Sequence, residues 1–451
     1  MHPGERENAR GTVNFLLMKN FSSLFFCLIF LPGWCVSQSR NVLTNDGAWC
    51  WFSDPRAIYS GDNRIVTGWV TRDGSVEAAS LDLKSGKTVT KTLYPQLEVD
   101  DHDNPAFLKL SDGNVLAMYT WHGGKKGALG VIQQVTSTPG NVSSFGEPRV
   151  FLPKTDELLR KYVRETYTYA NPFLLSEENN RVLCFGRWIG FKPNLITSDD
   201  QGKTWSAPKV IITSKDLDVN NRPYVKYYSD GKSRIHLIFT DGHPASEPLN
   251  SVYYCYYEKG AFWRADGSRI CSLDQLPFHP SDASVVYKAS KADGKAWIFD
   301  VVVKNDQPVI VYTRYPTDTL HQYYYAAYTN GSWQHRKIMD AGRWFPQTQP
   351  GKKEREVNYS GGMTFDPSDP DVVYMSHQIN GRFEISKGRT RNSGKTWKLS
   401  PVTRNSQFDN VRPFVPRLRE SGQKKVLLWM ENKKYIHYTD YDSAILYKVI
   451  K

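Results

Sequence analysis

Residues 198–205 read Ser-Asp-Asp-Gln-Gly-Lys-Thr-Trp, and residues 390–397 read Thr-Arg-Asn-Ser-Gly-Lys-Thr-Trp. Both fit the Asp-box pattern Ser-x-Asp-x-Gly-x-Thr-Trp, the second with Thr and Asn substituted. In such a turn the carboxylate or amide accepts backbone N–H groups, the glycine takes a positive φ, and the tryptophan packs between neighbouring sheets. The pattern predicts a β-propeller and indicates almost nothing about chemistry.

The rest of the chain repeats in units of about fifty to seventy-five residues. Turns rich in Ser, Gly, Asn and Asp separate short apolar runs, and no helical periodicity appears. One unit cannot bury both faces of its sheet, whereas units stacked radially can. We predict an all-β fold with one seven-bladed β-propeller over residues 38–451. The seven units begin near Asp54-Pro55, Asn104-Pro105, Asn171-Pro172, Arg222-Pro223, Asp282, Tyr359-Ser360-Gly361 and Arg412-Pro413.

Residues 1–37 have the pattern of a signal peptide. Met18-Lys19-Asn20 is a basic start, residues 24–31 are apolar, and cleavage is expected after Ser37. The polar stretch before Met18 favours Met18 as the true start. The apolar core is shorter than the ~20 residues of a membrane span, and Trp34 is too bulky to precede a lipidated Cys35. We expect a secreted, periplasmic or cell-surface protein without a membrane span.

The chain is basic. Its formal charge is +12, and residues 1–37 carry three cations and two anions, so +11 remains after their removal. For an exported protein this charge favours an acidic polysaccharide as partner over nucleic acid. A generally basic surface without a dedicated partner is the alternative interpretation. We expect a monomer.

Two histidines flank one predicted hairpin. His102 precedes the apolar run 106–110, His122 follows the return run 115–119, and the turn Ser111-Asp112-Gly113-Asn114 joins the two runs. A hairpin returns the chain to its starting point, so both imidazoles are expected at the same end of two paired strands. A single histidine is more often structural, but a converging pair indicates acid–base catalysis.

The propeller geometry extends this argument to other units. In each blade the first strand starts, and the second ends, on the same face near the axis. The third unit then contributes Tyr167 or Tyr169 and, from the end of its second strand, Arg187 or Trp188. The expected result is a polar, cationic bowl, although a tyrosine there can equally be core and an arginine can pair with a carboxylate in the wall. Candidate substrate-binding residues are Arg222, Tyr224, Lys226, Asn104 and Trp121.

Five segments of the chain, at residues 51–56, 101–105, 120–122, 222–227 and 241–244, carry a resemblance to a known group of proteins. They resemble segments of propeller proteins with bacterial-neuraminidase-type repeats. Within that group the chain is most similar to the short ulvan lyases of polysaccharide lyase families 24 and 25. This resemblance implies catalytic roles for His102, His122, Tyr167 and Arg187. It also implies cleavage of ulvan, a sulfated rhamnose–uronate polymer, by β-elimination at the 4-O-linked uronic acid.

Elimination from a uronate requires these side-chain types. A neutral imidazole such as His102 can take the weakly acidic C5 proton, and Tyr167 can protonate the departing O4. Arg187, with His122, can stabilise the charge that develops on the carboxylate. The mechanism requires no catalytic cofactor.

A second group of residues suggests a metal. His243, Cys255, Cys271 and His279 follow one another with gaps of eleven, fifteen and seven residues. Four N and S ligands are typical of one structural zinc site, and the family resemblance implies a metal here. The alternative is a Cys255–Cys271 disulfide, which suits an exported protein.

The sequence does not exclude two other classes of function. A sialidase-like or rhamnosidase-like hydrolase could use Arg56, Arg222 and Arg314 as an arginine triad. Hydrolases usually need two positioned carboxylates as well, and the predicted bowl is poor in them. A propeller that only binds acidic glycans is the third class, for which paired histidines are unnecessary.

Overall fold

The computed structural model describes residues 41–122, 130–162, 165–214, 221–317, 320–342, 361–418 and 422–450. The predicted signal peptide (residues 1–37), with its start at Met18 and with Cys35, lies outside these ranges, as do Tyr359 and Ser360. No helix within the described ranges is long and apolar enough to cross a membrane.

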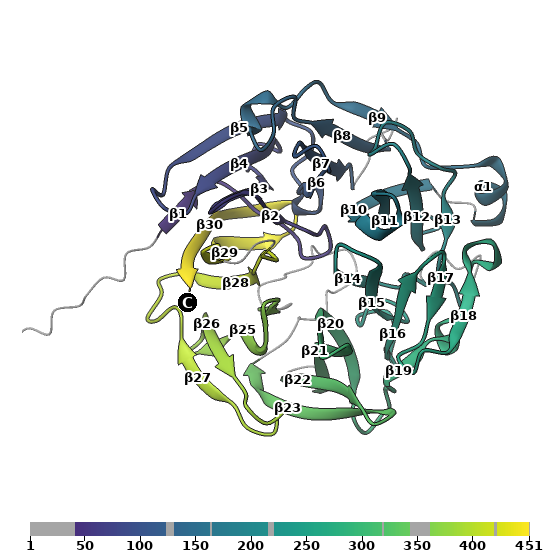
Figure 1. The fold of residues 1–451 in the computed structure, drawn as a ribbon. Helices are drawn as coiled ribbons and strands as arrows, with labels where there is room; N and C mark the ends of the chain where they lie inside the picture. Colours follow the sequence, from purple (N-terminus) through teal and green to yellow (C-terminus); the bar gives the residue numbers. More distant parts are fainter. Residues whose placement is uncertain are drawn as a thin grey trace, which may run out of the picture. The chain divides into compact units, whose positions relative to one another are not determined.

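The described residues form seven antiparallel sheets arranged as the blades of a propeller (Figure 1), which confirms the predicted fold class. The first blade is β2 (Ala57–Gly61), β3 (Arg64–Val70), β4 (Val76–Asp82) and β5 (Thr88–Tyr94). The second is β6 (Ala106–Lys109), β7 (Val115–Thr120), β8 (Val131–Val135) and β9 (Arg149–Phe151). The third is β10 (Glu165–Leu175), β11 (Arg181–Ile189), β12 (Pro193–Ser198) and β13 (Lys209–Val210), preceded by the helix α1 (Asp156–Tyr162).

The fourth blade is wider than the others because its sheet has six strands rather than four. It contains β14 (Val225–Ser229), β15 (Arg234–Thr240), β16 (Val252–Glu258), β17 (Ala261–Trp263) and β18 (Arg269–Ser272), and β19 (Ser284–Tyr287) pairs with β16. The fifth blade is β20 (Lys295–Lys304), β21 (Gln307–Thr317), β22 (Leu320–Thr329) and β23 (Ser332–Gly342). The sixth is β24 (Met363–Asp366), β25 (Asp369–Ile379), β26 (Arg382–Arg389) and β27 (Lys398–Pro401).

The last blade joins distant parts of the sequence. It consists of β28 (Asp409–Phe414), β29 (Lys425–His437), β30 (Asp440–Ile450) and β1 (Asn41–Thr44), and β1 pairs with β30. The first described strand thus completes the sheet formed by the last three strands. Short 3₁₀ helices complete the described elements: η1 (Asp101–Asp103), η2 (Val142–Ser144), η3 (Ser176–Glu178), η4 (Leu273–Gln275) and η5 (Pro280–Asp282).

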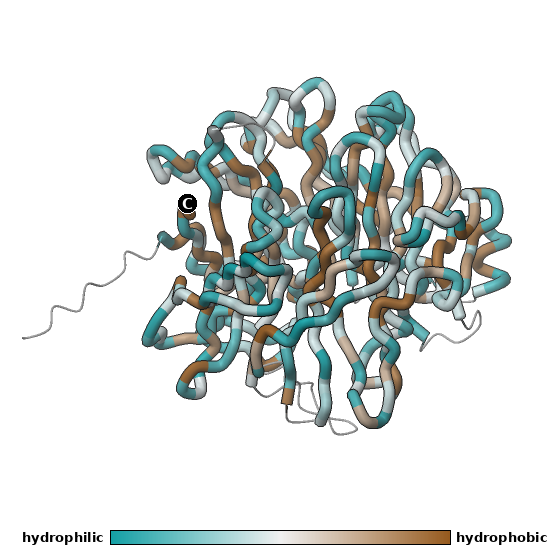
Figure 2. Tube along the Cα trace, turned by 60° about the horizontal axis from the view of Figure 1, so that its bottom comes forward, coloured by the Kyte–Doolittle hydropathy of each residue, from teal (hydrophilic) through white to brown (hydrophobic). Residues whose placement is uncertain are grey.

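The hydrophobic core lies between blades rather than within them. One buried cluster joins the first and second blades, another the second and third, and further clusters continue around the ring to the seventh and first. Figure 2 shows hydrophobic stretches within the strands and hydrophilic colour at many turns. As predicted, each sheet buries its faces against the neighbouring sheets, and this burial holds the blades together.

Both Asp-box turns have the predicted geometry. In the first turn, Asp200 Oδ1 accepts the Thr204 N–H at 2.8 Å, and Gly202 has a φ of +88°. Trp205 stacks on Phe151 of the preceding blade, with ring centroids 5.7 Å apart. In the second turn, Asn392 replaces the aspartate and accepts the Thr396 N–H at 2.9 Å.

One predicted unit start is wrong. The Asp282 segment does not open the fifth blade, which begins with β20 at Lys295. Instead, Pro280–Asp282 forms η5, and the strand after it pairs with β16 and widens the fourth sheet. A polar-plus-proline pattern marks the start of a 3₁₀ helix as well as the start of a blade, so the sequence pattern alone misplaced this boundary.

Candidate active site

The hairpin of β6 and β7 brings the two predicted histidines together. Ala106 pairs with Met118, so the segment before β6 and the segment after β7 emerge side by side. His102 lies in η1, where the Asp100 side chain caps the turn by accepting the His102 N–H at 2.9 Å. The two imidazole rings stack, with centroids 4.2 Å apart and planes 23° from parallel.

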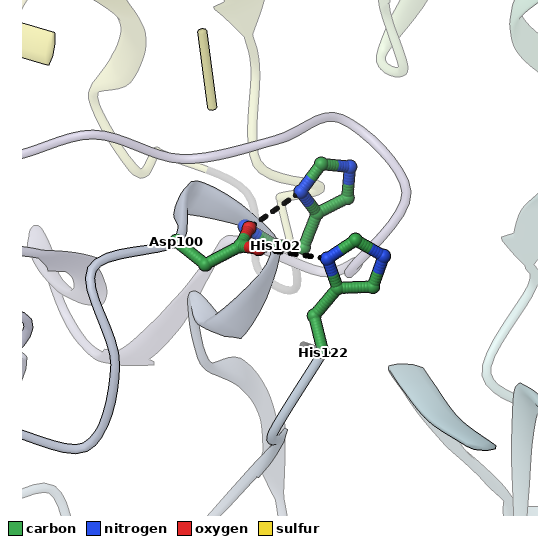
Figure 3. Close-up of side chains that lie close together, drawn as sticks. All are labelled: Asp100, His102 and His122. Carbon is green, nitrogen blue, oxygen red and sulfur yellow. Dashed lines mark hydrogen bonds and ion pairs between the residues drawn. The ribbon is translucent and has the colours of Figure 1, made fainter. Parts of the chain in front are cut away.

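Both imidazoles bind the same carboxylate. His102 Nδ1 lies 2.7 Å from Asp100 Oδ1, and His122 Nδ1 lies 2.7 Å from Asp100 Oδ2 (Figure 3). An ionised carboxylate only accepts hydrogen bonds, so each Nδ1 carries the hydrogen and each Nε2 is the basic nitrogen. Figure 3 shows both Nε2 atoms on the side of the rings away from Asp100.

The charges around the pair favour a neutral imidazole beside an ionised carboxylate. Burial opposes ionisation of Asp100, but the adjacent His122 and His102 hold the pKa of Asp100 below its ordinary value. Burial lowers the pKa of His122, and this effect outweighs the attraction of Asp100, which raises the same pKa. Burial and the charge of Asp100 raise the pKa of Asp103 well above its usual range. At neutral pH, His122 is therefore equipped to accept a proton.

The histidines line a cavity of about 310 Å³. Its walls come from the segment before β2 and from the second, third, fourth and seventh blades. Among its described lining residues are three guanidinium groups and one carboxylate, Asp101, so the wall is cationic. The lining residues are Cys50, Trp51, Phe52, Asp101, His102, His122, Tyr169, Arg187, Arg222, Tyr224, His243, Ala245, Ser246, Arg412 and Tyr438.

Arg187 reaches the cavity from β11 and is 4% exposed. Its guanidinium carbon lies 5.0 Å from the Tyr169 ring centroid and 4.6 Å from that of Tyr224. Contact with two aromatic rings restricts the orientation of the guanidinium, which suits the recognition of a planar carboxylate.

Tyr169, rather than Tyr167, is the tyrosine of the cavity, which corrects the predicted assignment. The pairing of β10 with β11 shifts register between Thr168 and Asn171, and Tyr169 has a φ of +65°. Such a bulge redirects a side chain that strict alternation would place elsewhere. Tyr167 is instead 1% exposed, packs between the second and third blades, and donates its hydroxyl to Glu165 at 2.6 Å.

The Tyr169 hydroxyl has the properties of a proton donor. It is buried without a hydrogen-bond partner among the described residues, in a side chain that lines the cavity. Burial and the neighbouring Tyr224 raise the pKa of Tyr169 well above its ordinary value, so the phenol keeps its proton. An unpaired buried hydroxyl is costly, and a substrate oxygen would supply the missing partner.

The five predicted substrate-binding residues divide into two groups. Arg222 and Tyr224 line the cavity. Lys226 does not, because its ammonium group is buried and pairs with Asp54. Asn104 is fully buried and its Oδ1 accepts the Cys50 N–H at 3.1 Å, while Trp121 packs against the core between the first two blades. These three side chains hold the fold rather than face the cavity.

The seventh blade contributes residues that the sequence did not indicate. Arg412 of β28 donates to Asp101 at 2.6 Å, and Tyr435 of β29 also donates to Asp101. Tyr438, in the turn between β29 and β30, places its ring edge-on to His102, with centroids 4.7 Å apart. The η1 loop of the second blade is thus fixed by residues more than 300 positions away in sequence.

The predicted zinc ligands do not come together. His243 lines the cavity, where its Nδ1 accepts the Ala245 N–H at 3.1 Å. His279 is exposed and caps η5. Cys255 and Cys271 are buried free thiols, not a disulfide, and no three of the four side chains bring their ligand atoms within 4.8 Å of one another. These four side chains therefore do not fit a four-ligand zinc site.

The arginine triad of a sialidase is also absent from the described part of the cavity. Of the three arginines considered, Arg222 alone lines it. Arg56 is buried and pairs with Asp54 at 3.0 Å, and Arg314 stacks between Tyr287 and Tyr324 on the fifth blade.

Comparison with known proteins places the chain in a family. The sequence profile described as "BNR repeat-containing family member" matches residues 65–341, more than half of the chain. The chain therefore belongs to the BNR repeat-containing family, a class consistent with its propeller fold. No curated protein sequence matches it.

Solved structures include polysaccharide lyases with the same fold. An ulvan lyase of polysaccharide lyase family 25, bound to glucuronic acid linked 1–4 to 3-sulfated rhamnose, has a TM-score of 0.65 at 12% identity, covering 91% of this chain and 95% of its own. A second family 25 ulvan lyase structure has a TM-score of 0.66 at 13% identity and the same coverage. The polysaccharide lyase Uly1 has a TM-score of 0.54 at 14% identity, covering 90% of this chain and 97% of its own. At such identities the likeness establishes the fold, and the chemistry must be argued from the cavity.

Proposed function

We propose that this protein is a polysaccharide lyase that cleaves a polymer at a 4-O-linked uronic acid by β-elimination. The observation that carries the proposal is the pair of stacked imidazoles on one buried carboxylate, in a cavity that also holds Arg187 and Tyr169. These are the groups that an elimination needs: a base, an acid and a cation for the substrate carboxylate.

Each group has one task in the proposed reaction. The guanidinium of Arg187 binds the uronate carboxylate and makes the C5 proton more acidic. An Nε2 atom of the His102–His122 pair takes that proton, the C4–O4 bond breaks, and a C4=C5 double bond forms. Tyr169 protonates the departing O4. Asp100 stabilises the imidazolium that forms, as the buried carboxylate does in a Ser-His-Asp triad.

The carboxylates of the cavity argue against a hydrolase. Retaining and inverting glycosidases use two carboxyl groups on either side of the scissile bond. Asp101 is the one carboxylate among the described lining residues, and Arg412 and Tyr435 already donate to it. A carboxylate held in this way is poorly placed to act as an acid or a nucleophile.

We propose ulvan as the polymer. The basic charge of the chain and the cationic wall of the cavity suit a polymer that carries both sulfate and carboxylate groups. Similarity in fold to ulvan lyases supports the same choice. An exported location, proposed from residues 1–37, would bring the protein to such a polymer.

The test is ultraviolet absorbance during incubation with ulvan, alginate, heparin-type and pectin-type polymers. Elimination creates a conjugated 4,5-unsaturated uronate, which absorbs, whereas hydrolysis creates no double bond. The proposal predicts an absorbance gain with ulvan. New reducing ends without an absorbance gain would identify a hydrolase, and polymer retention without any cleavage would identify a glycan-binding propeller.

A further inference from the structure

Tyr438 contacts both imidazoles of the His102–His122 pair. It lies in the turn between β29 and β30 of the seventh blade and lines the cavity of about 310 Å³. Its ring meets that of His102 with centroids 4.7 Å apart and planes at 89°, and that of His122 with centroids 5.5 Å apart and planes at 72°. Edge-to-face contacts between aromatic rings have centroid separations of about 4.5–7 Å, so both contacts are close enough to be attractive.

The main chain of Tyr438 is fixed to the same part of the site. Its carbonyl oxygen accepts the Asp101 N–H at 3.0 Å, which ties this turn of the seventh blade to η1. The His437 ring packs against the Tyr438 ring, with centroids 3.7 Å apart, and His437 Nδ1 lies 2.8 Å from Thr439 Oγ1. Since its main chain and its neighbours both hold it, the Tyr438 ring is a fixed wall for the histidines.

The histidines need such a wall because Asp100 holds each ring at one atom. Nδ1 of each ring is 2.7 Å from an Asp100 oxygen (Figure 3). One hydrogen bond leaves a ring able to swing about the bonded atom, and a swing displaces Nε2, the nitrogen that accepts the proton. A contact on a second side of the ring restricts this motion. The restriction matters because a misplacement of about 1 Å can lower a rate about 10²-fold.

We propose that Tyr438 is a positioning residue for the base of the lyase. Its ring keeps the two imidazoles in their stacked orientation, with Nε2 directed at the substrate, and shields them from water. The hydroxyl group of Tyr438 is not needed for this role, because the ring makes the contacts. The effect on the rate rests on the proposed function, whereas the effect on the histidines does not.

Steady-state kinetics of two variants test the positioning role. Tyr438→Ala removes the ring, so kcat should fall about 10–100-fold, while KM stays close to the wild-type value because Arg187 still binds the uronate carboxylate. Tyr438→Phe keeps the ring and should retain the wild-type kcat. Tyr447→Ala is the matched control and should leave kcat unchanged, because it truncates a tyrosine of the same blade that packs in the core between the first and last blades.

A titration of the histidine side chains by nuclear magnetic resonance tests the shielding without substrate. Burial is the largest influence on the pKa of His122 and lowers it, so the water admitted in Tyr438→Ala should raise that pKa towards the ordinary value of 6.5. Tyr438→Phe should keep the wild-type pKa. The other charged and titratable groups that face the pair are the same in all of these variants: Asp100, Asp101, Asp103, Tyr169 and Arg187.

Thermal unfolding verifies that each variant is folded, and Tyr438→Leu, which lacks an aromatic ring, carries the test if Tyr438→Ala does not fold. Unchanged kcat in the folded Tyr438→Ala variant would overturn the positioning role. An equal loss of kcat in Tyr438→Phe would also overturn it, because the hydroxyl group would then be the part that acts. An unchanged pKa of His122 in Tyr438→Ala would overturn the shielding. A raised pKa, in a protein that eliminates none of the polymers, would refute the proposed function and leave the shielding in place.

Discussion

His102 and His122 stack at 4.2 Å and share Asp100 as the acceptor of both Nδ1–H groups. Two imidazolium rings at this distance would repel each other, and one carboxylate can balance only one of them. Burial already lowers the pKa of His122, so at neutral pH the His122 ring is neutral and can accept a proton without forming such a doubly charged pair. This is the state required of a base that accepts one proton per turnover.

The first prediction concerns Asp100. In Asp100→Asn the amide has one acceptor oxygen, so it cannot accept both Nδ1–H groups, and one imidazole loses the tautomer that leaves Nε2 basic. We expect kcat to fall about 10²–10⁴-fold. The exposed Asp62→Asn is the matched control and should leave kcat unchanged. If the folded Asp100→Asn variant kept the kcat of the wild type, the shared carboxylate would have no role in catalysis.

The pH profile gives an independent readout. Burial lowers the pKa of His122, so the acid limb of kcat/KM should have its midpoint below the ordinary histidine value of 6.5. The Asp100 charge raises that pKa, so the limb should move to still lower pH in Asp100→Asn. A shift to higher pH would contradict this assignment of the charges.

The second prediction compares two tyrosines that lie two positions apart. Tyr169→Phe should lower kcat about 10²–10⁴-fold, because the departing oxygen loses its proton donor. Tyr167→Phe should keep wild-type kcat and lose about 0.5–1.5 kcal/mol of stability, because it removes only the hydrogen bond to Glu165. Steady-state kinetics and urea unfolding measure the two effects. The reverse pattern would restore Tyr167 as the catalytic tyrosine.

The third prediction concerns the contact between the second and seventh blades. Asp101 is fully buried and pairs with Arg412, which is 5% exposed. Removing one partner of a buried pair leaves an unbalanced charge, so Asp101→Asn should destabilise the fold by about 3–5 kcal/mol. The exposed pair of Lys337 and Asp340 is the control, and Asp340→Asn should cost less than about 1 kcal/mol. Equal effects in urea unfolding would show that Asp101 does not fix the η1 loop.

The fourth prediction concerns acid stability. Burial lowers the pKa of His236 and of His243 to about 3, so both are neutral in the folded state. As the pH falls below about 6.5 the unfolded chain binds protons first, so stability is lost from there down to about pH 3. The slope is at most ~1.4 kcal/mol per pH unit for each histidine. Urea unfolding from pH 7.5 to pH 4 should show this slope, and His236→Gln should reduce it. A flat profile would contradict the assignment.

Local sequence patterns predicted the propeller and the histidine pair for a physical reason. The turn at residues 198–205 is specified by hydrogen bonds within eight residues, and one short hairpin brings His102 and His122 together. Both features depend on contacts close in sequence, which a pattern can reveal.

Other parts of the site depend on features that no local pattern carries. Tyr169 rather than Tyr167 faces the cavity because β10 shifts register twice against β11, between Glu165 and Thr168 and between Thr168 and Asn171. Arg412 and Tyr438 reach the cavity only because the ring closes between the first and last blades. Lys226 has the right position for the bowl, but the buried Asp54 binds it. The aspartate two residues before His102 was the one available signal for the shared carboxylate, since a capping aspartate is expected there.

The most direct test of the account is the initial rate of ultraviolet absorbance gain on purified ulvan, compared between the wild type, His102→Ala and His279→Ala. The account predicts a steady gain with the wild type and with His279→Ala, and none with His102→Ala, which should still retain the polymer. An intact rate in His102→Ala, or polymer cleavage by the wild type without any absorbance gain, would contradict it.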